Sequence, residues 1–139
     1  MSISLTSFLV VVFYMPLAYN DTMKENYIPQ VVAETPTYLK AVNALWDEQT
    51  QIEFKNFISL NPYEGDIIPG TGGIRKVRWH GSGHGKRGGV RVVYYVYNEN
   101  NPIYLLFAYP KNVKENISDK EKKILAEIVT ELKHVLRSD

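Results

Sequence analysis

The side chains of this chain that could do chemistry are mostly cations, and they gather in residues 65–91. Six basic residues lie in this stretch: Arg75, Lys76, Arg78, Lys86, Arg87 and Arg91. No Asp or Glu interrupts the sequence between Asp66 and Glu99. The common fate of Lys and Arg is a solvated face, but cations without acids to neutralise them attract anions. The stretch therefore predicts a phosphate-binding surface.

A glycine-rich loop divides these cations into two groups. Residues 80–89 contain five glycines in ten positions, which is long for a hairpin connection. Long loops in compact domains are usually functional or disordered, so a flexible connector is the alternative. A glycine backbone can approach a phosphate closely, and Lys86 and Arg87 sit at the return of the loop.

The familiar nucleotide and metal motifs are not satisfied. Residues 70–73 (GTGG) resemble a phosphate cradle, but a P-loop needs Gly-Lys-Ser/Thr at the start of a helix, and here a strand follows. His80 and His84 form an incomplete ligand set without a nearby carboxylate or thiol. We therefore expect no metal and no cofactor, and His84 is kept as a candidate RNA contact.

Other enzyme classes are excluded by composition. The chain has 139 residues, enough for one domain, and no cysteine. The absence of cysteine removes disulfides, thiolate zinc sites and thiol nucleophiles. No serine, histidine and acid set and no spaced carboxylate pair indicates a hydrolase of those types.

Strand geometry brings part of the cationic stretch to one surface. In an expected strand at 74–79, Lys76 and Arg78 share the side away from the core, because alternate side chains face opposite sides. Arg91 has the matching position on the next strand. Pairing of these strands as a hairpin would bring the three cations together. Tyr109 and Lys111, at the end of the third strand, could stack on a base and contact a phosphate.

The elements that must position these residues follow from caps and periodicity. We expect an extended segment at 28–34, helices capped by Thr35 and Asp47, strands at 74–79, 90–97 and 103–109, and a last helix capped by Ser118 with Glu121. The short links favour an antiparallel meander. The predicted fold is α+β: a small antiparallel sheet of about four strands, with two N-terminal helices and one C-terminal helix laid on a face.

The N-terminal segment does not match a targeting template. Residues 1–20 carry no charged side chain, the apolar run at 3–17 contains Pro16, and the first basic residue is Lys24. A secretory signal would begin with basic residues, and the run is short for a membrane span. Three interpretations stand: a leader translated from an upstream start, a signal or anchor that would export the protein, or an extra element packed on the domain. We favour the first, with an extension at 1–22 outside the core fold and a domain at 23–139.

The sequence resembles the RelE superfamily of bacterial type II toxins, and most closely its HigB-type branch. The similar segments are 65–68 (GDII), 70–78 (GTGGIRKVR), 86–95 (KRGGVRVVYY), 104–106 (YLL), the pattern Tyr109-x-Lys111-Asn112, and the final helix. The likeness runs from about Met23 to the end, is strong at 65–112, and has no counterpart for residues 1–22.

The resemblance implies a RelE-like fold and a metal-independent endoribonuclease. Such an enzyme would act in the cytoplasm and cleave mRNA in the A site of the ribosome. The resemblance also implies a cognate antitoxin, a HigA-type helix-turn-helix protein, through which operator DNA is bound. The implied catalytic residues are Lys76, Arg78, Arg91, Tyr109 and Lys111, and the expected RNA contacts are Arg75, Lys86, Arg87 and His84. No membrane partner is expected.

Two questions stay open at this stage. Pro110 and Lys111 stand where some family members have His or Asp, so the group that moves protons is not fixed, although Lys76 or Tyr109 could be the base. Arginine stays protonated at neutral pH and suits a phosphate clamp. The alternative function is a basic RNA- or ribosome-binding module that does not cleave.

Overall fold

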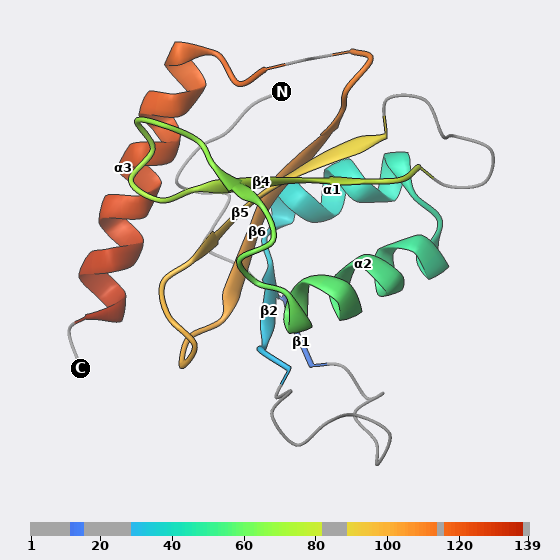
Figure 1. Ribbon diagram of the computed structural model, residues 1–139, viewed down its shortest axis with the longest axis horizontal. Coiled ribbons are helices and arrows are strands. Elements are labelled where there is room, and N and C mark those ends of the chain that lie inside the picture. Colours follow the sequence, from blue (N-terminus) through green and yellow to red (C-terminus); the bar gives the residue numbers. More distant parts are fainter. Residues whose placement is uncertain (1–11, 16–28, 82–88, 114–115, 138–139) are drawn as a thin grey trace.

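The chain folds into an α+β structure around one sheet. The computed structural model describes residues 12–15, 29–81, 89–113 and 116–137. The predictions for His84, Lys86 and Arg87 lie outside these residues. The elements, in order, are β1 (Val12–Tyr14), β2 (Val32–Glu34), α1 (Pro36–Leu45), α2 (Glu48–Leu60), β3 (Asp66–Ile67), β4 (Arg75–Trp79), β5 (Val90–Val96), β6 (Ile103–Pro110) and α3 (Asp119–Leu136) (Figure 1).

The sheet has the strand order β1-β2-β6-β5-β4-β3. The strands β4, β5 and β6 form the predicted antiparallel meander. The α+β class is confirmed, but the expectation of about four antiparallel strands is wrong in detail. The described residues form six strands, and β2 pairs with β6 in parallel. The chain can make this parallel pair because α1, α2 and the meander supply the long connection that parallel strands need.

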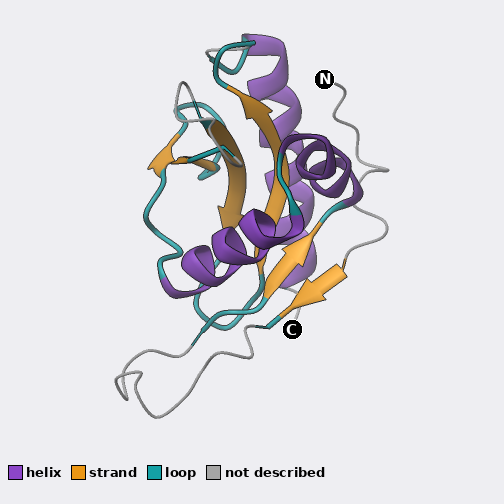
Figure 2. Ribbon diagram, turned by 90° about the vertical axis from the view of Figure 1, so that its right-hand side faces the viewer, coloured by secondary structure: helices purple, strands orange, loops and turns teal. Residues whose placement is uncertain are grey.

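The helices cover both faces of the sheet, which corrects the expectation of helices on a single face. Figures 1 and 2 show α1 and α2 on one side and α3 on the other. The first core joins Tyr38, Val42, Phe54 and Ile58 of the helices to sheet residues such as Val92. The second core packs α3 against the other face of β5 and β6. Side chains of one strand therefore belong to two different cores.

The predicted helix caps are present. Thr35 Oγ1 accepts a hydrogen bond from the Tyr38 backbone N–H at 3.3 Å, with Pro36 at the first helical position. Asp47 Oδ1 accepts from the Thr50 backbone N–H at 2.8 Å. Each bond satisfies one of the free N–H groups at a helix start, so α1 and α2 begin where the sequence indicates.

Helix α3 buries a narrower stripe than its sequence suggests. Leu125, Ile128 and Val129 are buried, whereas Val135, in the last turn, is 63% exposed. None of the helices in the described parts of the chain has the length and apolar character needed to cross a membrane.

The sheet extends into the N-terminal segment. Strand β1 pairs antiparallel with β2, and Tyr14 stands opposite Val32. Strand β1 lies within residues 1–22, which were predicted to be an extension outside the core fold. The observation favours the third interpretation, an element packed on the domain, for the residues of β1. A domain boundary after residue 22 stays a prediction.

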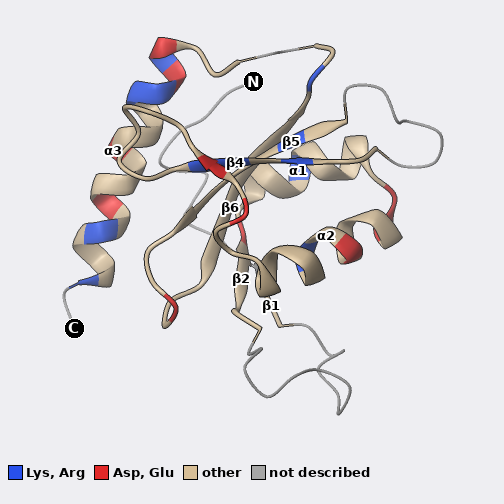
Figure 3. Ribbon diagram, in the orientation of Figure 1, with Lys and Arg blue, Asp and Glu red and all other residues tan. Residues whose placement is uncertain are grey.

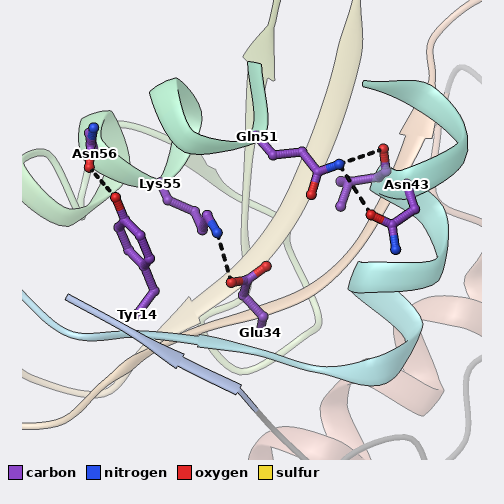
Figure 4. Close-up of polar contacts among 7 residues, drawn as sticks. Tyr14, Glu34, Asn43, Gln51, Lys55 and Asn56 are labelled. Atoms are coloured by element: carbon purple, nitrogen blue, oxygen red, sulfur yellow. Dashed lines mark hydrogen bonds and ion pairs between the residues drawn. The ribbon is translucent and has the colours of Figure 1, made fainter. Parts of the chain in front are cut away.

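A polar cluster ties β1 and β2 to α2 (Figure 4). The hydroxyl of Tyr14 donates to Asn56 Oδ1 at 2.7 Å. The Lys55 ammonium group lies 3.0 Å from Glu34 Oε1 and 4.3 Å from the centroid of the Tyr14 ring. Both charged side chains are largely buried, so the pair compensates charges that would otherwise be costly inside the protein.

Candidate active site

Three of the predicted site residues form a row across the sheet. In the register of the meander, Arg78 of β4 is opposite Arg91 of β5, and Arg91 is opposite Tyr109 of β6. Side chains directly opposite on antiparallel strands have Cβ atoms about 4.5–5.5 Å apart. Lys76 lies on the same side, two residues along β4. The structure therefore brings Lys76, Arg78 and Arg91 together, as strand parity predicted, and Tyr109 lies beside them.

This arginine row, defined as Arg78, Arg91 and Tyr109, lies on the face of the sheet that packs against α3. Tyr109 belongs to the same buried cluster as Leu125 of that helix. Figure 3 shows Lys and Arg on β4 and β5 where the two strands run side by side. Arg78 is exposed and Arg91 is half-buried, so the row passes from solvent into the edge of the core.

Two arginines stand directly opposite one another in the row, which is an unfavourable arrangement for a sheet. Like charges at opposed positions repel and destabilise strand pairing. Side chains of one sign gathered on a surface also attract ions of the opposite sign. The arrangement of Arg78 and Arg91 therefore supports a phosphate site.

Glycine at position 89 makes room for this row. Gly89 has φ of +59°, a left-handed conformation that side chains rarely adopt. A Cβ atom there would lie 2.5 Å from the Trp79 carbonyl oxygen and 3.6 Å from Arg78 Nε. The start of β5 can thus approach β4 closely only because residue 89 has no side chain.

Tyr109 is a core residue with a free hydroxyl. Its side chain is 1% exposed, and its ring centroid lies 6.1 Å from that of Phe107. Among the described residues, the hydroxyl has no hydrogen-bond partner. Burial raises the pKa of Tyr109; the Arg91 charge opposes this rise and the Glu121 charge adds to it. Tyr109 is therefore protonated at neutral pH and can donate a hydrogen bond.

Glu121 is a residue near the site that sequence reasoning missed. Its Oε1 atom accepts hydrogen bonds from the Ser118 backbone N–H and from Ser118 Oγ, both at 2.9 Å. The sequence predicts Glu121 as part of the capping box, and that role alone accounts for an acid at this position. The available signal was spacing: Glu121, Leu125 and Ile128 recur at i, i+4 and i+7, which places the acid on the stripe that faces the sheet.

Arg75 is held away from the row. It has the opposite strand parity to Lys76, and its Nη1 donates to the carbonyl oxygens of Gly65 at 2.7 Å and Tyr63 at 3.3 Å. Its guanidinium group lies 5.1 Å from the Tyr63 ring centroid. Arg75 therefore braces the turn before β3, and an RNA contact there would be separate from the arginine row.

Lys111 lies just after β6, at the end of the sheet that carries the row. Its backbone N–H donates to the Gly89 carbonyl oxygen at 3.2 Å, and its side chain is half-buried. The predicted Lys111 contact therefore remains close in space to Arg91 and Tyr109 through the paired strand ends.

His80, considered above as half of an incomplete metal-ligand pair, packs on Trp79. The two rings are 5.0 Å apart between centroids, with 29° between their planes. His84 lies outside the described residues. Within the parts of the chain that the structure describes, no group of three or more His, Asp or Glu side chains could hold a metal ion.

A comparison with known protein families identifies the class of protein that carries this site. The family model described as the RelE toxin of the RelE/RelB toxin–antitoxin system matches residues 63–139. This is more than half of the chain and includes every element that carries the site, from β3 to α3. The chain belongs to the RelE toxin family. It is accordingly a toxin of a toxin–antitoxin system with an antitoxin as partner, in a family whose members are generally ribonucleases.

Proposed function

We propose that this toxin is a ribosome-dependent, metal-independent mRNA endonuclease that inhibits translation. The observation that carries the proposal is the arginine row, with Lys76 beside it on the same face. The row places two cations and a tyrosine hydroxyl on neighbouring strands at opposed positions. Family membership supports a ribonuclease, and the row supplies groups that suit RNA cleavage.

The reaction is a transesterification within the RNA. The 2′-hydroxyl oxygen attacks the adjacent phosphorus, a P–O2′ bond forms, and the P–O5′ bond breaks. One proton leaves the 2′-hydroxyl and one is delivered to the departing 5′-oxygen. Without a metal ion, side chains must move both protons and stabilise the charge that develops on the phosphoryl oxygens.

The residues of the row fit distinct parts of this reaction. Arg78 and Arg91 are always protonated and serve as clamps on the phosphoryl oxygens. Tyr109, whose pKa is raised by burial, suits a donor to the phosphate or the 5′-oxygen better than a base. Lys76 is then the remaining proton-transfer candidate among these four. Lys111 is proposed to contact a flanking phosphate.

The wider assignment follows the likeness at residues 65–112. We place the protein in the HigB-type branch, with mRNA in the ribosomal A site as substrate and the cytoplasm as the place of action. The antitoxin is proposed to be a HigA-type helix-turn-helix protein, so operator DNA would be bound only through it. Arg75, His84, Lys86 and Arg87 are proposed as further RNA contacts outside the row.

Replacement of the clamps tests the nuclease. Arg78→Ala and Arg91→Ala should each lower cleavage of mRNA on purified ribosomes by about 10²–10³-fold, as expected when one group that stabilises transition-state charge is lost. Both should relieve growth arrest in cells. Lys40→Ala is the matched control, because Lys40 is an exposed cation on α1 and should leave cleavage unchanged. Thermal unfolding checks that each variant folds.

The alternative function is a basic module that binds RNA or the ribosome without cutting. Both functions predict binding that weakens steeply with salt. They differ in the product, because only the nuclease yields new RNA ends at the A-site codon. A folded Arg78→Ala, Arg91→Ala double variant that arrests growth as fully as the wild type would rule out the nuclease.

A further inference from the structure

Glu121 brings a negative charge to the part of the sheet that holds the arginine row. β4, β5 and β6 contain no Asp or Glu, and Asp66 of β3 stands opposite Lys76 rather than opposite either arginine. Glu121 lies in sequence between Ile117 and Leu125, which share one buried cluster with Tyr109, and its charge adds to the rise in the pKa of Tyr109. Tyr109 is directly opposite Arg91 in the sheet register. The field of the carboxylate therefore reaches the arginine row.

The position of this carboxylate is fixed. Glu121 is 9% exposed, and its Oε1 accepts both the backbone N–H and the hydroxyl of Ser118. In return, the Ser118 hydroxyl oxygen accepts the Glu121 backbone N–H at 3.2 Å. A long acidic side chain on a surface would move and be screened by salt, whereas a pinned and buried one is screened much less.

A fixed negative charge here has two opposite effects. In the free protein it offsets the repulsion between Arg78 and Arg91, which stand directly opposite one another. When a phosphate arrives between the arginines, the same carboxylate repels it. One group thus favours the unbound state of the site over the bound state.

We propose that Glu121 is a built-in counter-ion of the arginine row, which stabilises the free protein and weakens its hold on the RNA backbone. The inference rests on the proposed function in taking RNA as the ligand. It gives the acid a role beyond capping α3: it sets the affinity of the site, so that the arginines hold RNA less tightly than their charges alone would.

Two variants separate the charge of Glu121 from its capping role. Glu121→Gln removes the charge and keeps the box, since Gln is the other residue that completes it. Ser118→Ala breaks the box and keeps the charge. The probe is a short 2′-O-methyl oligoribonucleotide, which binds but cannot be cleaved because it has no free 2′-hydroxyl. Glu121→Gln should bind it about 3- to 10-fold more tightly and unfold at lower temperature. Ser118→Ala should also unfold at lower temperature, with wild-type affinity.

The outcomes distinguish this proposal from the proposed function. Equal or weaker binding by Glu121→Gln overturns the counter-ion role. A wild-type protein that does not bind the probe overturns RNA binding itself and this proposal with it. Should Glu121→Gln not fold alone, the comparison is made in Arg78→Gln, where one of the opposed arginines is gone. Removal of the carboxylate must tighten binding there too, and an unchanged affinity overturns the proposal.

Discussion

At the scale of single residues, Tyr109 combines two properties that rarely occur together. Its side chain is buried, yet its hydroxyl has no hydrogen-bond partner among the described residues. An unsatisfied buried hydroxyl costs free energy, and most buried polar groups in proteins are paired. In the proposed site this unsatisfied hydroxyl would serve function, because a hydroxyl without a protein partner can donate a hydrogen bond to a substrate oxygen.

Removal of this hydroxyl should separate stability from function. Tyr109→Phe keeps the ring and its packing against Phe107, so we expect the free energy of unfolding to stay the same or rise by up to about 1 kcal/mol. Cleavage of mRNA on ribosomes should fall about 10²-fold or more, because a proton or hydrogen-bond donor is lost. Urea unfolding and a cleavage assay measure the two quantities.

Tyr104→Phe is the matched control for that experiment. Tyr104 is also on β6 and packs on the second core, but it lies away from the row, so this variant should cleave like the wild type. A Tyr109→Phe protein that is clearly destabilised and fully active would show that the hydroxyl is a structural group rather than a substrate contact.

The sequence predicted much of the site at this scale and missed one part of it. Strand parity was enough to bring Lys76, Arg78 and Arg91 together, since a period of two fixes which side chains share a face. The same parity places Arg75 on the other face, a signal that the cationic composition of the stretch obscured. Glu121 could not be found from local pattern, because its proximity to Tyr109 depends on how α3 docks.

At the scale of elements, the hairpin of β4 and β5 depends on the conformation of Gly89, the residue just before β5. The Gly89 carbonyl oxygen accepts a hydrogen bond from the Lys111 backbone N–H, and the Trp79 carbonyl oxygen leaves no room for a side chain at position 89. Both the left-handed φ and the close approach require glycine. Gly70 also has a positive φ, of 81°, but open space surrounds it.

These two glycines make a matched pair of substitutions. Gly70→Ala meets only conformational strain and should lower the free energy of unfolding by about 1 kcal/mol. Gly89→Ala adds a steric conflict with backbone and should cost clearly more, about 2–4 kcal/mol, with loss of cleavage because Arg78 is displaced. Urea unfolding of the two variants checks the order. Equal costs would show that the hairpin return adjusts freely.

The longer elements were predictable and the short ones were not. The strands at 74–79, 90–97 and 103–109 were expected within one or two residues of β4, β5 and β6, because they carry β-branched and aromatic runs between turn residues. β1 and β3 have three and two residues, too few for a periodic pattern. The parallel pairing of β2 with β6 depends on tertiary packing, and no local sequence pattern specifies it.

At the scale of the whole molecule, tyrosines make the fold sensitive to alkali. The described tyrosines with a raised pKa are Tyr14, Tyr38, Tyr94, Tyr95, Tyr104 and Tyr109, and burial is the largest cause in each. A group with a raised folded pKa holds its proton more tightly in the native state. Its contribution to stability is therefore complete below the ordinary tyrosine pKa of about 10 and is lost as pH rises above it.

The free energy of unfolding should consequently fall as pH rises past about 10, by up to about 1.4 kcal/mol per pH unit for each tyrosine that ionises only on unfolding. Urea unfolding at a series of pH values from neutral to strongly alkaline measures the slope. Tyr38→Phe should make the slope shallower, because burial raises the pKa of Tyr38 well above its ordinary value. A slope that Tyr38→Phe leaves unchanged would contradict this account.

The parallel pairing of β2 with β6 has a consequence for the order in which the chain can fold. The Thr35 hydroxyl donates to the Leu105 carbonyl oxygen across 70 positions of sequence, and such distant contacts form late because a long loop must close first. The first core also needs Ile103, Leu105 and Ala108 of β6. A nascent chain that stops short of β6 thus has an incomplete first core and lacks Tyr109, so a cell that makes this toxin meets its activity only near the completion of each chain.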